Sequence, residues 1–87
     1  MNIEDTIKEM IIHHFMAGEE NPQLPSDVSF LEKGIIDSTG VLELVTFLEG
    51  TFDIKVEDEE LVPENLDSVN HLVRFVNRKL EKEKVNG

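Results

Sequence analysis

The chain of 87 residues contains no cysteine, which excludes disulfide bonds and thiolate-bound zinc as sources of stability. Long apolar runs are also absent, since none approaches the roughly 20 residues that span a bilayer. Glu4 and Asp5 precede any apolar stretch, unlike the basic start of a signal peptide. We therefore expect a soluble, cytoplasmic protein with one domain over residues 1–87, whose ordered core at about 3–80 depends on buried apolar side chains.

Basic residues are scarce, with eight against nineteen acidic ones and a net charge of −11. The excess is concentrated in residues 37–67, where ten acidic residues accompany only Lys55, whereas residues 68–87 carry a net +3. A field of this sign repels phosphate backbones, so nucleic acid is excluded as a favoured ligand. It attracts basic protein partners to the middle of the chain. The plainer alternative is a charged surface that only keeps the protein soluble.

Apolar side chains recur at intervals of three and four in three stretches, which predicts three main helices. The first covers residues 3–16, the second begins at or just after Ser38, and the third begins near Val69. Their expected inner faces are Ile3, Ile7, Met10, Ile11 and Phe15 in the first, Val41, Leu44, Val45, Leu48 and Phe52 in the second with Leu42 widening the stripe, and Val69, Leu72, Val73, Val76 and Leu80 in the third with Phe75 at the edge.

The segments between these helices predict a long first connection and one short helix. Residues 17–36 are interrupted by prolines, and Phe30 and Leu31 are expected to anchor this loop in the core. One helical turn is expected between Glu57 and Leu66, with Pro63 in its first turn. Asp67 or Ser68 should cap the last helix, and residues 81–87 should fray. The predicted fold is all-α, a small four-helix bundle of three main helices and one short helix.

The segment Gly34-Ile35-Ile36-Asp37-Ser38-Thr39-Gly40 places a serine hydroxyl where a loop ends and a helix begins. Ile35 and Ile36 should tether the loop to the core. A phosphate esterified to Ser38 would lie beside unpaired backbone N–H groups and the positive end of the helix dipole. Taken alone, however, an aspartate and a serine at a helix start are also typical of a simple cap.

A catalytic nucleophile is the other alternative for Ser38, and the sequence argues against it. The nucleophile-elbow pattern requires glycine two residues before and after the serine, and Ile36 occupies the first of these positions. Activation also requires a nearby base, and nothing in the sequence brings a histidine to Ser38. We therefore assign no catalytic residue; the histidines are His13, His14 and His71.

Residues 30–45, from Phe30 to Val45, resemble the phosphopantetheine attachment region of acyl carrier proteins. The resemblance extends over about residues 3–80. It implies an acyl-carrier fold and a non-catalytic role as a carrier. It also implies that a phosphopantetheinyl transferase, with magnesium bound in the transfer complex, moves a 4′-phosphopantetheine arm from coenzyme A to Ser38, with Asp37 as its motif partner. The matching positions beyond residue 45 are Leu48, Glu49, Phe52, Val56, Asp58-Glu59-Glu60 and Asp67-Ser68-Val69.

The resemblance further implies that partner enzymes recognise the acidic second helix. These partners are the transferase, an acyl- or aminoacyl-loading ligase, and synthases or acyltransferases with basic docking patches, and the carrier is expected to be a monomer. The candidate recognition residues are Glu43, Glu49 and Asp53, with Thr39 and Leu42 as non-ionic contacts.

Two positions depart from the pattern of fatty-acid carriers. Those usually have leucine and then an acid after the serine, whereas this chain has Thr39 and Gly40. The Asp-Ser-x-Gly form is more similar to D-alanyl carriers and other specialised stand-alone carriers. The cargo stays open at this point: a fatty acyl or hydroxyacyl group of fatty-acid, lipid or specialised metabolite synthesis, or an aminoacyl or peptidyl group loaded by an adenylating ligase.

Two readings of the acidic residues remain outside the carrier hypothesis. An unmodified acidic helical adaptor, which binds basic partners without a prosthetic group, is the alternative from a different class. A metal site at Asp58-Glu59-Glu60 is disfavoured, because the run lacks the glycine and alternating ligands of an EF-hand loop. We therefore assign no metal ligand and interpret the run as a solvated face.

Overall fold

The computed structural model describes residues 2–20 and 23–86, without the side chains of residues 82–86. Its described residues form α-helices and one 3₁₀ turn, and no strand occurs among them. This confirms the predicted all-α class. The elements are α1 (Ile3–Phe15), α2 (Gly40–Phe52), the 3₁₀ turn η1 (Asp58–Glu60), α3 (Pro63–Leu66) and α4 (Val69–Asn86).

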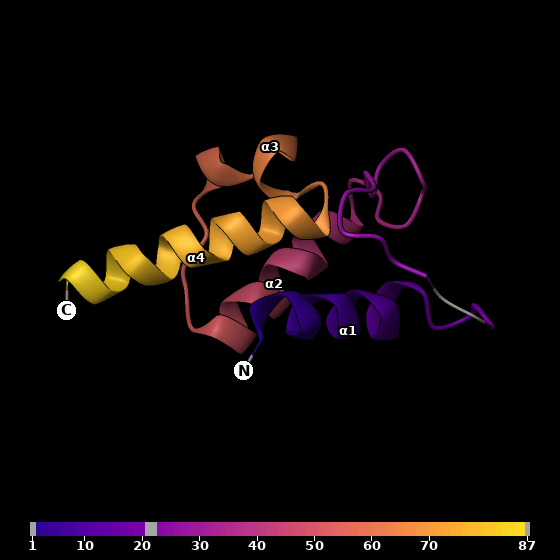
Figure 1. Cartoon of the computed structure of the whole chain (residues 1–87). Coiled ribbons are helices and arrows are strands. Elements are labelled where there is room, and N and C mark those ends of the chain that lie inside the picture. The colour runs from indigo at the N-terminus through magenta and orange to yellow at the C-terminus, as the bar shows by residue number, and fades with distance from the viewer. Residues whose placement is uncertain (1, 21–22, 87) are drawn as a thin grey trace.

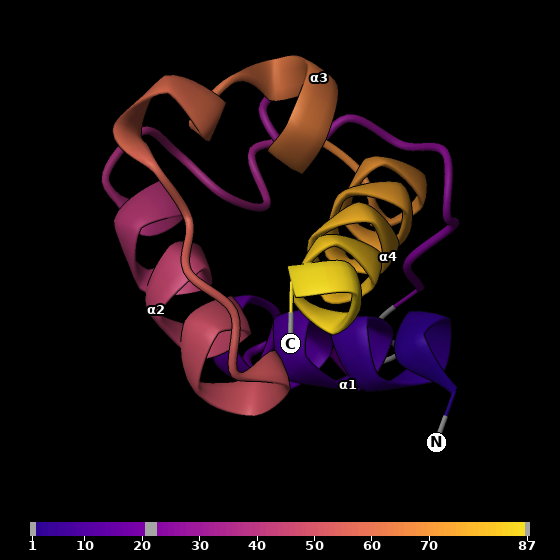
Figure 2. The same cartoon turned by 90° about the vertical axis from the view of Figure 1, so that its left-hand side faces the viewer.

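The helices surround a single apolar core. α4 packs against both α1 and α3, while α2 lies on the other side of the core from α4 (Figures 1 and 2). The expected inner faces supply this core. Its fully buried side chains include Ile7 and Ile11 of α1, Leu44 and Leu48 of α2, and Val69, Leu72 and Val76 of α4.

Two expectations about the helix faces were wrong. Phe75, expected at the edge, is buried because α3 covers that side of α4. Leu42, expected to widen the inner stripe of α2, is 61% exposed and lies outside the core.

The last helix is longer than predicted. We expected residues 81–87 to fray, but α4 continues to Asn86, and Gly87 lies outside the described residues. The glutamate and lysine residues of this stretch are good helix formers, which favours continuation of the helical backbone.

The long connection between α1 and α2 contains no helix in its described residues. Buried apolar side chains attach it to the core. Leu24, Phe30 and Ile36 are buried, which confirms Phe30 as an anchor. The expectation for Leu31 was wrong, because its side chain is 50% exposed. The chain turns at this point, because the N–H of Ile35 donates to the Phe30 carbonyl at 2.9 Å. Phe30 is therefore buried, while the next side chain, Leu31, is exposed.

Asp67 fastens this connection to the start of α4. Its carbonyl accepts from the N–H of Phe30 at 2.9 Å, and its Oδ1 accepts from the N–H of Leu31 at 3.0 Å. The hydroxyl of Ser29 donates to the other carboxylate oxygen. Asp67 therefore joins residues that lie more than 35 positions away in the sequence.

Ser68, the other candidate cap, closes the N-terminus of α4. Its Oγ accepts from the N–H of His71 at 3.1 Å and lies 2.8 Å from Nδ1 of the same histidine. This bonding keeps His71 at the helix start as part of the cap.

The segment between α2 and α4 contains two short turns, η1 and α3, where one was expected. Pro63 occupies the first turn of α3, as predicted. Polar contacts hold the segment against α4: Lys79 Nζ lies 2.9 Å from Glu60 Oε1, and Asn65 Nδ2 donates to the Glu60 carbonyl at 3.0 Å. The guanidinium of Arg78 donates to the Asn65 side chain at 2.8 Å.

Candidate functional site

Asp37 shapes the turn on which Ser38 lies. Its Oδ1 accepts from the N–H of Gly40 at 2.7 Å, and its carbonyl accepts from the N–H of Val41 at 3.1 Å. The first helical turn therefore begins at Asp37, although the regular helix begins at Gly40. Ser38 and Thr39 lie in this first turn with exposed side chains. The predicted helix start at or just after Ser38 is confirmed.

Gly40 lies at a close approach between α1 and the start of α2. A Cβ atom at this position would lie 3.1 Å from Cγ2 of Ile36 and 3.3 Å from Cε1 of Phe15. The sequence showed only that glycine stands here in place of the acidic residue that is usual in fatty-acid carriers. The structure adds a steric reason, because a larger residue would push apart the two elements that hold the Ser38 turn.

The Ser38 hydroxyl accepts and donates no hydrogen bond among the described residues, and the same holds for the backbone N–H groups of Ser38 and Thr39. The histidines make other contacts. The ring of His14 stacks on Phe47 with centroids 3.9 Å apart and meets His13 edge-on, while His71 caps α4 with Ser68. The described residues thus leave the exposed Ser38 hydroxyl without an activating base.

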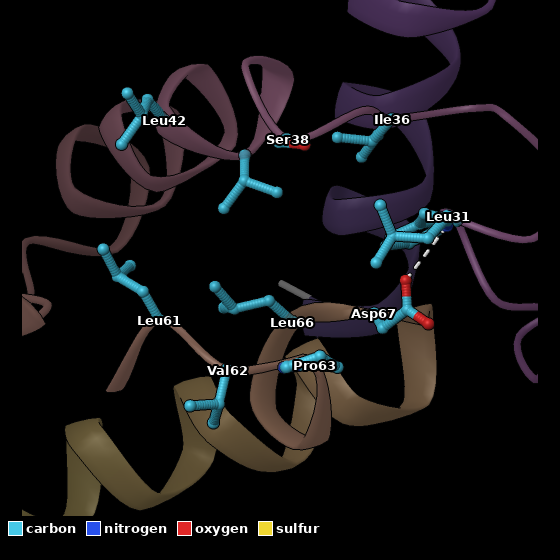
Figure 3. Close-up of a pocket in the computed structure, with 11 residues that line it drawn as sticks. Leu31, Ile36, Ser38, Leu42, Leu61, Val62, Pro63, Leu66 and Asp67 are labelled. Carbon is cyan, nitrogen blue, oxygen red and sulfur yellow. Dashed lines mark hydrogen bonds between the residues drawn. The ribbon is translucent and has the colours of Figure 1, made fainter. Parts of the chain in front are cut away.

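An apolar cavity of about 310 Å³ opens beside Ser38. Figure 3 shows it between the start of α2, the turn after Phe30, and the segment that leads into α3. Ser38 and Asp67 are its polar lining residues, and both lie on its wall. The apolar lining residues are Phe30, Leu31, Ile36, Val41, Leu42, Leu61, Val62, Pro63 and Leu66.

No local sequence pattern indicated this cavity, because its walls come from three separate segments of the chain. The apolar run Leu61-Val62-Pro63 was a usable signal, because these residues are too few to form a core of their own and must face other apolar groups.

The predicted recognition residues separate into two groups. Thr39, Leu42 and Glu43 are exposed on the first turns of α2, close in sequence to Ser38. Asp53 is exposed at the other end of the helix, roughly 20 Å away by helical rise, in a left-handed conformation with φ 55°. Glu49 is half-buried, and its Oε2 accepts from the N–H of Val56 at 2.9 Å, so it fastens the segment after α2.

No group of three or more histidine, aspartate or glutamate side chains within residues 2–20 and 23–86 is placed to hold a metal ion. No helix in the described part of the chain is long and apolar enough to cross a membrane.

No protein-family model matches the chain. It is similar to curated proteins named D-alanyl carrier protein from Streptococcus pyogenes, among them those of serotype M5 (strain Manfredo), serotype M49 (strain NZ131) and serotype M1. Each is 34% identical over 76 residues, which cover 87% of this chain and 92% of the relative. The similarity confirms the resemblance to specialised stand-alone carriers that the Thr39-Gly40 pair indicated.

Proposed function

The chain belongs to the carrier-protein family that includes the D-alanyl carrier proteins, and on this basis we propose that it carries an aminoacyl group on Ser38. The cargo is a D-alanyl group or a close relative of it, held on a 4′-phosphopantetheine arm. The protein is a non-catalytic, monomeric, cytoplasmic carrier of a single domain. The observation that carries the proposal is the exposed Ser38 hydroxyl at the start of α2, beside an apolar cavity.

The residues around Ser38 fit a phosphodiester-linked arm. The hydroxyl points to solvent at a helix start, and the N–H groups of Ser38 and Thr39 form no other hydrogen bond among the described residues. Donors in this position, together with the positive end of the helix dipole, favour a phosphate by about 0.3–1 kcal/mol at an exposed site. When attached, the group supplies a terminal thiol that holds the cargo as a thioester.

The chain's own residues hold the attachment serine in one conformation. Asp37 closes the turn through its bond to the N–H of Gly40, and Ile36, the residue before Asp37, is buried in the core. Gly40 allows Phe15 of α1 to pack against the same turn. Ser38 is therefore presented on a rigid turn, and the chemistry of attachment and loading belongs to other enzymes.

The cavity supports a distinction between apolar and aminoacyl cargo. Each buried methylene gains about 0.8 kcal/mol, so a medium-length acyl chain would gain several kcal/mol by entering a cavity with these walls. An alanyl group gains almost nothing, because its ammonium group loses hydration on burial. An aminoacyl cargo therefore stays outside the cavity and accessible to the next enzyme. The names of the relatives lend no support to a role in fatty-acid synthesis.

The acidic face of α2 supports recognition by basic partners. We propose a phosphopantetheinyl transferase, an adenylating ligase that loads the amino acid, and an acyltransferase that accepts it. Glu43, Thr39 and Leu42 lie nearest Ser38 and contact all of these enzymes, while Asp53 contacts only partners that extend along the whole helix. Glu49 contributes through the position of the segment that it fastens.

A measurement of the intact protein mass distinguishes the carrier from the alternative of an unmodified acidic adaptor. The purified chain is incubated with coenzyme A, magnesium and a broad-specificity phosphopantetheinyl transferase. A gain of one phosphopantetheine in the wild type, absent from Ser38→Ala, supports the carrier. The matched control Thr51→Ala, at the exposed far end of α2, keeps the gain, since it leaves the attachment hydroxyl and the residues around it in place. No gain with several transferases would favour the adaptor.

A further inference from the structure

We propose that the exposed side of α4 binds a short acidic segment of a partner protein. This surface consists of Asn70, Arg74, Asn77 and Arg78 and is termed the α4 face. Its two arginines bind the carboxylates of the segment. The inference goes beyond the proposed function, because it applies to the chain with or without an arm on Ser38.

The charge of α4 is opposite to that of the rest of the chain. Residues 68–87 carry a net +3, although the whole chain carries −11. Arg74 and Arg78 lie one helical turn apart and are both exposed, as are the amide side chains of Asn70 and Asn77. Like charges four residues apart on a helix repel each other and destabilise it slightly. The stability of α4 therefore does not explain this pair of arginines.

The fold uses the basic side chains of α4 to different extents. Lys79 is mostly buried, and its Nζ lies 2.9 Å from Glu60 Oε1, so it holds η1 against the helix. Arg78 donates to the Asn65 side chain at 2.8 Å. The guanidinium of Arg74 forms no hydrogen bond or ion pair with any described residue. Because a guanidinium has five N–H donors, most donors of the two arginines are available to a ligand.

An open hollow of about 280 Å³ lies beside the two arginines, between α3 and α4. Glu64 and Glu81 reach the same hollow, yet neither forms an ion pair with an arginine in the described part of the chain. Internal pairing therefore leaves space for an incoming side chain next to the guanidinium groups. The lining residues are Glu64, His71, Arg74, Asn77, Arg78 and Glu81.

The geometry of the arginines indicates carboxylates as the ligand groups. A guanidinium is planar and binds a carboxylate through two parallel hydrogen bonds. Arg74 and Arg78 are four residues apart, which is about 6 Å along the helix axis. A segment with two acidic side chains at a similar spacing, such as one turn of a helix, is complementary to this pair.

The net charge of the chain restricts the size of the acidic partner. An anionic membrane, a nucleic acid or a second copy of the chain would meet the whole charge of −11 and be repelled. A short segment contacts only the α4 face. The molecule is at least 20 Å across, so the acidic residues of α2 lie beyond the screening length of about 10 Å at 0.1 M salt. The described surface therefore favours a short acidic segment of a protein.

The α4 face is also separate from the surface around Ser38. Figure 2 shows α2 and α4 on opposite sides of the core, so the exposed side of α4 points away from α2. A segment bound there leaves Ser38 and the acidic face of α2 accessible. The α4 face can thus anchor the carrier to one protein while an enzyme acts on the other side.

The experiment titrates the labelled, unmodified chain with a synthetic helical peptide that has two glutamates four residues apart. The readout is the NMR signals of the backbone N–H groups of Arg74, Asn77 and Arg78, at about 0.1 M salt. We expect these signals to shift and to give a dissociation constant. Arg74→Gln and Arg78→Gln should each weaken binding about twofold to fivefold, and the double variant about tenfold. More salt should weaken binding by the wild type.

Three controls isolate the α4 face. A peptide with glutamines in place of the two glutamates should cause no shifts. Lys55→Gln removes the same charge from an exposed site outside α4 and should change the affinity by less than about twofold. Arg74→Gln should unfold at the temperature of the wild type, because its guanidinium forms no contact that the described fold uses.

The outcomes separate this inference from the proposed function. Absence of shifts on α4, equal shifts from the glutamine peptide, or an equal loss in Lys55→Gln would overturn the inference. So would binding to phosphatidylglycerol vesicles, or a dimer in size-exclusion chromatography, that the double variant abolishes. The double variant should still gain phosphopantetheine from a transferase. Failure of the wild type to gain it would overturn only the proposed function.

Discussion

The carboxylate of Asp37 and the backbone N–H of Gly40 lie 2.7 Å apart, so the residue before the proposed attachment serine closes the turn that presents it. This one side chain thereby closes the backbone turn at the start of α2, on which Ser38 lies. This relationship gives the Asp-Ser pair a physical role within the carrier itself, in addition to any contact that a transferase makes.

The turn predicts the effect of removing the cap. Asp37→Ala should lower the free energy of unfolding by about 1 kcal/mol, because the Gly40 N–H loses its acceptor at a helix N-terminus. Asp37→Asn keeps an acceptor oxygen and should cost less than half of that. Urea unfolding followed by the helical circular dichroism signal measures both. Equal stability of the alanine variant and the wild type would contradict the role of Asp37 as the cap.

The two glycines of α2 should respond differently to alanine. Gly50→Ala should raise the free energy of unfolding by about 0.5–1 kcal/mol, since its Cβ meets no atom within 4 Å and alanine favours the helix. Gly40→Ala should give no gain or a loss of about 1 kcal/mol, because its Cβ would press on Ile36 and Phe15. The same urea titration compares them. An equal gain at both positions would show that the α1–α2 contact adapts freely.

The electrostatic account of docking predicts a specific response to charge and salt. Glu43→Lys should lower kcat/KM of the transferase threefold to tenfold, because it places a positive charge beside the site that a basic partner approaches. The matched control Glu9→Lys, on the exposed face of α1, should change it by less than about twofold. Raising the salt concentration should lower the kcat/KM of the transferase more for the wild type than for Glu43→Lys. A rate that is independent of salt in both chains would refute this account.

The cavity predicts that cargo chemistry decides its occupancy. An octanoyl group on the modified chain should shift the NMR signals of the cavity residues Leu61, Val62 and Leu66, because its methylenes gain by burial. An alanyl group should leave these signals near those of the unloaded form. The signals of Ile7 and Ile11, in the core and outside the cavity lining, serve as the internal control. Equal shifts from both cargoes would rule out this distinction.

The parts of the site that sequence reasoning predicted are those that local rules determine. The helix start at Asp37-Ser38 depends on residues within four positions of each other, and the inner faces of the helices follow from their 3.6-residue period. Pro63 marked the first turn of α3 for the same reason, because its ring fits that position.

The parts of the site that sequence reasoning missed depend on contacts between segments that are distant in the sequence. Asp67 and Ser68 were the two candidate caps of α4, and Ser68 is the cap, whereas the Asp67 carboxylate bonds to Ser29 and Leu31, a pairing that no local pattern indicates. Leu31 was expected to anchor the loop beside Phe30 and Leu42 to widen the inner stripe of α2, but both are exposed at the rim of a cavity that no local pattern indicates. The steric need for Gly40 likewise depends on Phe15, which comes from another helix.

The most direct test of the central claim is the mass of the protein isolated from the cells that make it, under conditions that preserve thioesters. The account predicts a species that carries one phosphopantetheine and one further aminoacyl group of the mass of alanine, both located by fragmentation on Ser38. Treatment with hydroxylamine should remove only the aminoacyl part. A protein that carries no phosphopantetheine, or whose arm carries only fatty acyl groups, would contradict it.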